Sequence, residues 1–140
     1  GTEAANRGFG IDLALLADCD WIILCDYAFP AMHGKLCMIG VFDVILATKS
    51  PAKHPRLAIG FSVIGEPGET GTIKLEIIAP TAKVIAEAEA NFTLPDAGSA
   101  QAHLEIPNLV LPEFGRYAIQ IDLGDNLPKV AWFTLKQLSA

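Results

Sequence analysis

In LPEFGRYAIQIDL, residues 111–123, a short loop turns into an alternating strand. Pro112 ends one strand, and Gly115 permits a sharp turn before the next. From Tyr117 onward every second residue is apolar, which is typical of a strand with one face in a core. An acidic residue followed by Gly-x-Tyr matches the tyrosine corner, in which a tyrosine opening a late strand bonds back to the preceding loop. The stretch predicts an all-β, two-sheet Greek-key sandwich of the immunoglobulin-like kind.

Glycine and proline recur roughly every 10–15 residues along the rest of the chain, which is the spacing expected of an all-β domain. Residues 21–29 and 35–47 flank a glycine-containing turn and are predicted to form a hairpin. The Pro67-Gly68 step suits a type II turn. We expect eight strands in all: 21–29, 35–47, 57–64, 72–79, 83–94, 102–110, 116–123 and 129–138.

Two segments allow more than one interpretation. Alanine and glutamate in residues 83–94 favour a helix, but the apolar residues there alternate with period two, so we expect a strand. Residues 1–18 fit either a short helix or an arm that covers a sheet edge. We therefore predict a sandwich domain at residues 19–140, preceded by an arm or short helix at residues 1–18.

The composition excludes several classes of function. The 140-residue chain has a net charge of −6 and only 10 Lys plus Arg, so it lacks the basic surface that nucleic acid or anionic lipid would need. No apolar run approaches the roughly 18 residues of a membrane helix. Hydrophobic residues nevertheless make up 51% of the chain, which favours an apolar contact surface for a homodimer or a protein partner.

The cysteine content indicates the compartment. The chain has three cysteines, an odd number without the spacing of a disulfide framework. Residues 11–17 are too short and too interrupted by acid to be the core of an export signal. We therefore expect a protein of the cytoplasm.

The predicted hairpin holds a candidate metal or redox site. If Tyr27 pairs with Lys35 across the turn, Cys25 lies opposite Cys37 on the neighbouring strand. A metal site built on this pair would take further ligands from a histidine and an aspartate nearby. The alternative, which the usual behaviour of free cysteine favours, is two inert buried thiols. The candidate metal ligands are Cys25, Cys37, His33 and Asp26.

Acidic residues in the loops at Asp96, Asp122 and Asp125, with Asn126, invite a calcium-site interpretation. Aspartate and asparagine are also ordinary turn formers, and no EF-hand spacing is present. Turn formation is therefore the preferred interpretation of these residues.

The sequence offers histidines and serines but no catalytic motif. It has no Gly-x-Ser-x-Gly elbow and no glycine-rich phosphate loop. We interpret His54 as a solvated loop residue and the pair of His103 and Glu105 as a contact on a solvent-facing surface. The aromatic residues, Trp132 among them, fit a sandwich core better than a sugar-stacking platform. No catalytic residue and no cofactor is predicted.

Three segments carry a resemblance to a known family: ILCDYA at 23–28, IGVFD at 39–43 and PEFGRY at 112–117. Together with a glycine-lysine turn at 34–35, they resemble a bacterial family of small β-sandwich proteins without an assigned function. The resemblance covers about residues 21–137. It implies a sandwich fold and no activity, so no site residue can be transferred from it.

These observations favour a non-enzymatic binding or assembly module. The competing interpretation is an enzyme, or a metal- or ligand-binding protein, that uses the hairpin of Cys25 and Cys37. It requires those groups to converge in a pocket that solvent can reach. A third interpretation is a structural subunit of a larger bacterial assembly.

Overall fold

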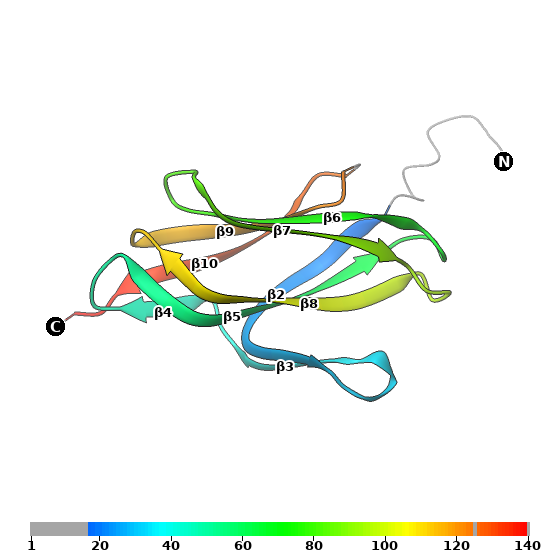
Figure 1. The fold of residues 1–140 in the computed structure, drawn as a ribbon, viewed down its shortest axis with the longest axis horizontal. Helices are drawn as coiled ribbons and strands as arrows, with labels where there is room; N and C mark the ends of the chain where they lie inside the picture. The colour runs from blue at the N-terminus through cyan, green and yellow to red at the C-terminus, as the bar shows by residue number, and fades with distance from the viewer. Residues whose placement is uncertain (1–16, 125, 140) are drawn as a thin grey trace.

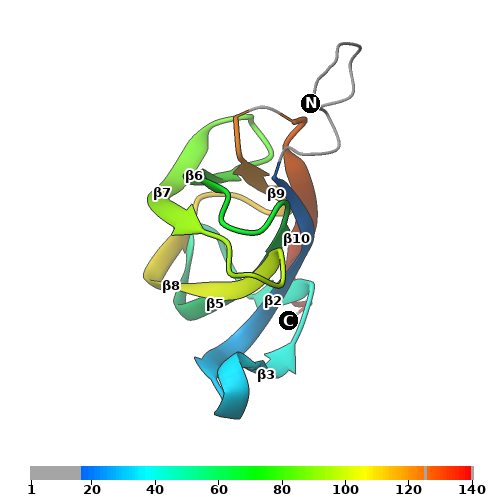
Figure 2. The same ribbon diagram turned by 90° about the vertical axis from the view of Figure 1, so that its right-hand side faces the viewer.

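The computed structural model describes residues 17–124 and 126–139, which form nine β-strands in two packed sheets (Figures 1 and 2). The predicted arm falls almost wholly outside these residues, and Asp18 already belongs to the first described strand. No helix in the described part of the chain is long and apolar enough to cross a membrane. The predicted all-β, immunoglobulin-like sandwich is confirmed.

The two sheets differ in size. The four-stranded sheet has the order β3 (Leu36–Val41), β2 (Asp18–Pro30), β5 (Ala52–Ile64) and β8 (Ser99–Leu111). The five-stranded sheet has the order β4 (Val44–Ala47), β10 (Lys129–Gln137), β9 (Gly115–Asp122), β6 (Thr70–Ile78) and β7 (Val84–Thr93). All strand pairs are antiparallel except β4 with β10, which run parallel.

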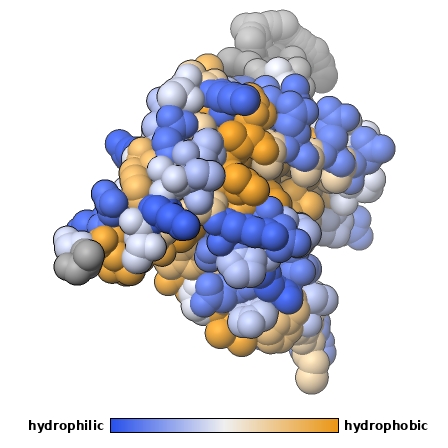
Figure 3. All heavy atoms as spheres, turned by 60° about the vertical axis from the view of Figure 1, so that its left-hand side comes forward, coloured by the Kyte–Doolittle hydropathy of each residue, from blue (hydrophilic) through white to orange (hydrophobic). Residues whose placement is uncertain are grey.

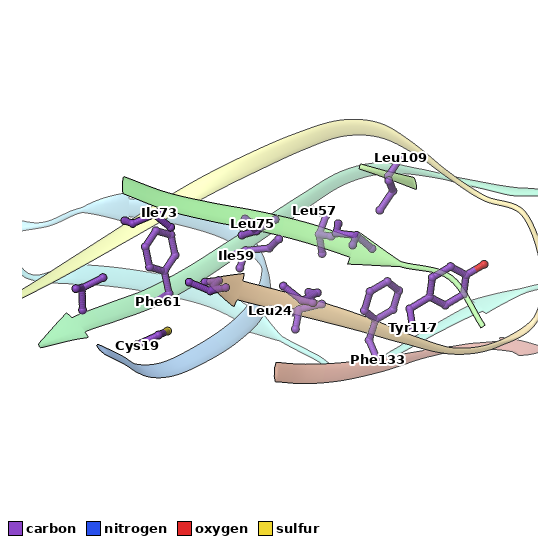
Figure 4. Close-up of a cluster of buried hydrophobic side chains, with 14 of the residues drawn as sticks. Cys19, Leu24, Leu57, Ile59, Phe61, Ile73, Leu75, Leu109, Tyr117 and Phe133 are labelled. Carbon is purple, nitrogen blue, oxygen red and sulfur yellow. The ribbon is translucent and has the colours of Figure 1, made fainter. Parts of the chain in front are cut away.

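The core lies between the sheets and is filled by the alternating residues of their inner faces (Figure 4). Leu57 and Ile59 of β5 and Ile119 of β9 are fully buried there, each contributing on the order of 2 kcal/mol of burial free energy. Tyr117 is equally buried and stacks on Phe133 with ring centroids 5.1 Å apart. The prediction that Tyr117 and Ile119 of the strand within residues 111–123 face the core is therefore confirmed.

The predicted single strand at residues 35–47 is wrong, because the chain changes sheets inside it. The N–H of Phe42 donates to the carbonyl of Leu24 in the four-stranded sheet at 3.1 Å. The carbonyl of the next residue, Asp43, accepts from the N–H of Thr134 in the five-stranded sheet at 2.9 Å. β3 and β4 therefore end up at corresponding edges of different sheets, and nine strands are described instead of eight.

The strand predicted at residues 83–94 is confirmed as β7. It pairs with β6 from Thr70 opposite Thr93 to Ile78 opposite Val84. The register shifts between Ile77 and Ile78, so Val84 is exposed while Ile85 packs against the core. The tertiary pairing outweighs the helix propensity of the alanines and glutamates.

A small second cluster of apolar side chains lies on the outer face of the four-stranded sheet. Cys25, Ala28 and Ala58 are buried in it, with Leu36 and Met38 of β3 packed against them. β5 presents small residues on this face, and a Cβ added at its Gly60 would lie 2.6 Å from the Met38 sulfur. The small side chains of β5 therefore let the β2–β3 hairpin pack closely against the sheet.

Candidate functional site

The turn of the β2–β3 hairpin fixes the position of every predicted metal ligand. His33 and Gly34 both adopt positive φ angles, 62° and 71°, and the last paired residues are Pro30 and Leu36. This turn is shorter than the one assumed from the sequence. Every cross-strand pair is therefore shifted by four residues from the predicted register.

The prediction that Cys25 lies opposite Cys37 is consequently wrong. Cys25 lies opposite Val41, and Cys37 lies opposite Phe29. The two cysteines are four residues apart along the hairpin, or about 13 Å at a rise of ~3.3 Å per residue. Two thiolates of one zinc site would lie within about 4 Å of each other, given bonds of ~2.3 Å to the metal.

Cys25 has the environment of a structural thiol. It is fully buried, and its Sγ donates to the carbonyl of Tyr27 at 3.2 Å. Burial raises the pKa of the Cys25 thiol above its ordinary value, which disfavours the reactive thiolate. Cys19 and Cys37 are also free thiols, and Cys37 is the most accessible of the three.

The other two candidates lie in different places. His33 is exposed at the tip of the hairpin, and Asp26 is exposed beside Gly40 at its base. Within residues 17–124 and 126–139, no three His, Cys, Asp or Glu side chains gather as a metal site would require. The structure therefore does not bring Cys25, Cys37, His33 and Asp26 together.

A groove that the sequence did not predict lies where the chain passes from β3 to β4. Its volume is about 400 Å³. Asp26 contributes a carboxylate at Gly40, where an added Cβ would collide with that group. The groove is lined by Asp26, Gly40, Val41, Phe42, Val44, Ile45, Leu46 and His54. It is thus an apolar hollow with one carboxylate and one imidazole.

His54 is a strand residue of this groove, which corrects its interpretation as a solvated loop residue. It belongs to β5, which begins five residues before the predicted start at Leu57. Its ring lies 5.8 Å from that of Phe42, and its Nε2 is buried without a hydrogen-bond partner. A buried nitrogen without a hydrogen-bond partner is uncommon in a folded domain, so hydrogen bonding is less complete in this groove than in the core.

Among the acidic loop residues, Asp96 lies in a turn, and Asp122 is the last residue of β9 and binds the turn that follows it. The Asp122 carboxylate accepts from the N–H of Gly124 at 2.7 Å, and the Asn126 side chain donates to the Ala17 carbonyl at 2.8 Å. Asp125 lies outside the described residues. On β8, Glu105 forms an ion pair with Arg56, whose guanidinium lies 4.6 Å from the centre of the Tyr27 ring.

Trp132 is on the surface rather than in the predicted core. It belongs to the outward-facing residues of β10 and is 47% exposed. The guanidinium of Arg116 covers its ring at 4.2 Å, and the cross-strand neighbour is the small Ala118. A shallow hollow of about 360 Å³ results on the outer face of the five-stranded sheet.

The two sheets, the tyrosine corner and the parallel edge strand β4 define an immunoglobulin-like β-sandwich. The chain belongs to DUF6941, a family of unknown function whose sequence profile matches residues 20–136. No curated protein is significantly similar to the chain.

The comparison with solved structures found similarity to the following three proteins, among others. An immunoglobulin-like protein from Pseudomonas aeruginosa is 13% identical, with a TM-score of 0.48 covering 88% of this chain and 98% of that protein. A β-glucosidase from Erythrobacter marinus is 16% identical, with a TM-score of 0.44 covering 68% of this chain and 14% of that enzyme. A β-D-glucoside glucohydrolase from Trichoderma reesei is 11% identical, with a TM-score of 0.48 covering 87% of this chain and 19% of that enzyme. The chain thus spans less than a fifth of either enzyme.

Proposed function

We propose that this chain is a non-enzymatic assembly module that binds protein along the β3 edge of its four-stranded sheet. The observation that carries the proposal is the chemical character of β3. Leu36–Val41 reads LCMIGV, with neither charge nor proline, at the end of the sheet. Such an edge is a template on which another strand can pair.

The other three sheet edges carry the features that prevent such pairing. β8 contains Pro107, which cannot donate a backbone hydrogen bond. β7 exposes Glu87 and Glu89. β4 has only four residues. Proline, charge and shortness are the usual protections of an edge strand, and β3 has none of them.

Exposed apolar side chains surround the β3 edge and add to the proposed contact surface. Ile39 is 51% exposed and Val41 64%, and Ile39 pairs with the half-exposed Tyr27 of β2. Val44 and Leu46 of β4 continue this surface into the groove. Figure 3 shows hydrophobic residues among hydrophilic ones at the lower end of the molecule, where the β2–β3 hairpin projects in Figure 1. A surface of this kind is typical of a protein contact.

We place the module in the bacterial cytoplasm. All three cysteines are free thiols, which supports a reducing compartment. The bacterial origin is supported by the family that the sequence resembles.

Site-specific photo-crosslinking tests the proposed function. A photoreactive residue at position 39 should give crosslinked species in the cells that express the chain. The same residue at Val110 is the matched control, because Val110 is equally exposed but lies on the protected strand β8. Absence of crosslinks at position 39, or equal crosslinking at both positions, would refute the proposed function.

A further inference from the structure

We propose that the partner on the β3 edge is a second copy of this chain, paired antiparallel with Lys35 of each copy in the groove of the other. This inference rests on the proposed function and names its partner. It is carried by the distribution of charge along β3 and by the position of the groove at one end of that strand.

The two ends of β3 carry opposite charges. Lys35 precedes the uncharged Leu36–Val41 and is exposed. Beyond the other end, Asp43 follows and the Asp26 carboxylate lies against Gly40. Within the described residues, ion pairs join Arg56 to Glu105 and Lys74 to Glu76. Neither pair includes Lys35 or Asp26, so both charges remain for a partner.

Antiparallel pairing of two copies satisfies these charges twice. In such a pair the start of each β3 lies beside the end of the other, which places each Lys35 near the acidic end of its neighbour. A parallel pair would place Lys35 beside Lys35 and Asp43 beside Asp43, which like-charge repulsion disfavours. The antiparallel arrangement also closes with twofold symmetry, the commonest symmetry of protein dimers.

The groove suits both the methylene groups and the ammonium group of a lysine side chain. Val41, Val44 and Leu46 offer apolar wall for the methylene groups, and Asp26 offers a carboxylate for the ammonium. Gly40 is the residue beside which that carboxylate lies, and an added side chain there would collide with it. The chemistry of the groove therefore matches the charged residue that antiparallel pairing brings to it.

The pairing also covers the exposed apolar residues. Ile39 of each copy lies within the paired strands near the centre of the interface. Each Val41 lies at one end, with Val44 and Leu46, in the groove that receives Lys35 of the other copy. Two short strands become the middle of one continuous sheet of eight strands. The edge groups of β3 thereby obtain the partners that an exposed edge strand lacks.

Charge reversal tests the arrangement by sedimentation equilibrium and native mass spectrometry of the purified full chain. Asp26→Lys and Lys35→Glu should each weaken the dimer about tenfold or more, because each puts like charges together. The double variant should recover dimerisation to within about threefold. An equimolar mixture of the two single variants should form the heterodimer in preference to either homodimer, because both contacts then join opposite charges.

Matched controls separate this effect from a change in net charge or in folding. Glu89→Lys and Lys83→Glu make the same changes of charge at exposed positions away from the groove, and should leave dimerisation unchanged. Asp26→Asn keeps the size of the side chain beside Gly40 and should weaken the dimer less than Asp26→Lys. It therefore keeps the test valid should the lysine variant fail to fold.

The outcomes distinguish this inference from the proposed function. A wild-type chain that stays monomeric would overturn the second copy as the partner, and single variants that dimerise normally would overturn the contact between Lys35 and Asp26. Single variants that weaken the dimer without recovery in the mixture would overturn the contact between Lys35 and Asp26. If position 39 crosslinks only to other proteins, the assembly function stands and this inference fails. If it crosslinks to nothing, both fail.

Discussion

The hydroxyl of Tyr117 donates a 2.6 Å hydrogen bond to the carbonyl of Glu113 and accepts a 3.1 Å bond from the N–H of the same residue. One buried side chain thus satisfies both backbone groups of a loop residue. Burial raises the pKa of Tyr117 above its ordinary value, so the hydroxyl keeps the proton that it donates. The tyrosine corner predicted from the sequence is present, and it ties the β8–β9 loop to the core.

Removing this hydroxyl should destabilise the sandwich. We expect Tyr117→Phe to lower the free energy of unfolding by about 1–3 kcal/mol, because both backbone groups of Glu113 lose their partner. Chemical denaturation measures the loss. Tyr27→Phe is the control, because Tyr27 is half exposed, and it should change stability by less than about 0.5 kcal/mol. Equal losses in the two variants would contradict the role of the corner.

Gly40 should tolerate alanine less well than a glycine of the same conformation elsewhere. Gly40 and Gly68 have φ angles of 75° and 78°, but an added Cβ meets the Asp26 carboxylate at Gly40 and open space at Gly68. Gly68→Ala should cost about 1 kcal/mol for the left-handed backbone alone, and Gly40→Ala should cost more. Thermal denaturation compares them. Adding Asp26→Ala should relieve the excess at Gly40, and failure to do so would exclude the collision as its cause.

The packing of the hairpin on β5 should depend on the absence of a side chain at Gly60. Gly60→Val should displace Met38 and Leu36, whose atoms would lie 2.6 Å and 3.1 Å from the added Cβ. We expect a loss of about 1–3 kcal/mol, typical of an overpacked site. Combination with Met38→Ala should recover part of the loss in a double-mutant cycle. Strictly additive effects would show that the two residues are not in contact.

The stability of the protein should fall in alkaline solution partly because of Cys19. Burial, followed by the neighbouring Asp18 carboxylate, raises the pKa of this thiol from 9.0 to about 11. Between these values the unfolded chain releases a proton that the folded chain retains, so unfolding becomes easier as the pH rises. The full contribution is on the order of 2 kcal/mol and is present below about pH 9.

Denaturation curves measured from pH 8 to 11 test this assignment. Cys19→Ala should flatten the alkaline decline, although Tyr117 and Cys25, whose pKa values are also raised by burial, retain part of it. The accessible Cys37 provides the matched variant, and Cys37→Ala should keep the decline of the wild type. An unchanged slope in the Cys19 variant would rule out its thiol as a source.

The fold was predictable where local chemistry and tertiary structure agree. The stretch at residues 111–123 combines a turn glycine, a corner tyrosine and an alternating strand, and each is specified by neighbouring residues. The same holds for the type II turn, where Gly68 has a positive φ and the N–H of Glu69 donates to Glu66 at 3.0 Å. Alternation also identified β7 correctly against its helix-favouring composition.

The edge groove could not be predicted, because it depends on relationships between distant segments. Residues 35–47 alternate as one strand, and nothing in their composition marks the change of sheet at Phe42 and Asp43. The register of the hairpin depends on two successive left-handed residues, His33 and Gly34, and a shift of a few residues relocates every cross-strand partner. This shift in register moves Cys37 away from Cys25 and places Asp26 beside Gly40.

The change of sheet between Phe42 and Asp43 makes one of the chain crossings between the two sheets very short. The backbones of these two successive residues form hydrogen bonds to opposite sheets, so the main chain links the two sheets directly. On the opposite side, the chain crosses from β7 to β8 through the five residues 94–98, whereas the crossing from β3 to β4 takes only the two residues 42 and 43. A shorter link leaves two edge strands less freedom to move apart, so we expect the sheets to separate more readily at β7 and β8 than at β3 and β4. The side proposed for assembly is therefore the one on which the backbone links the two sheets most directly.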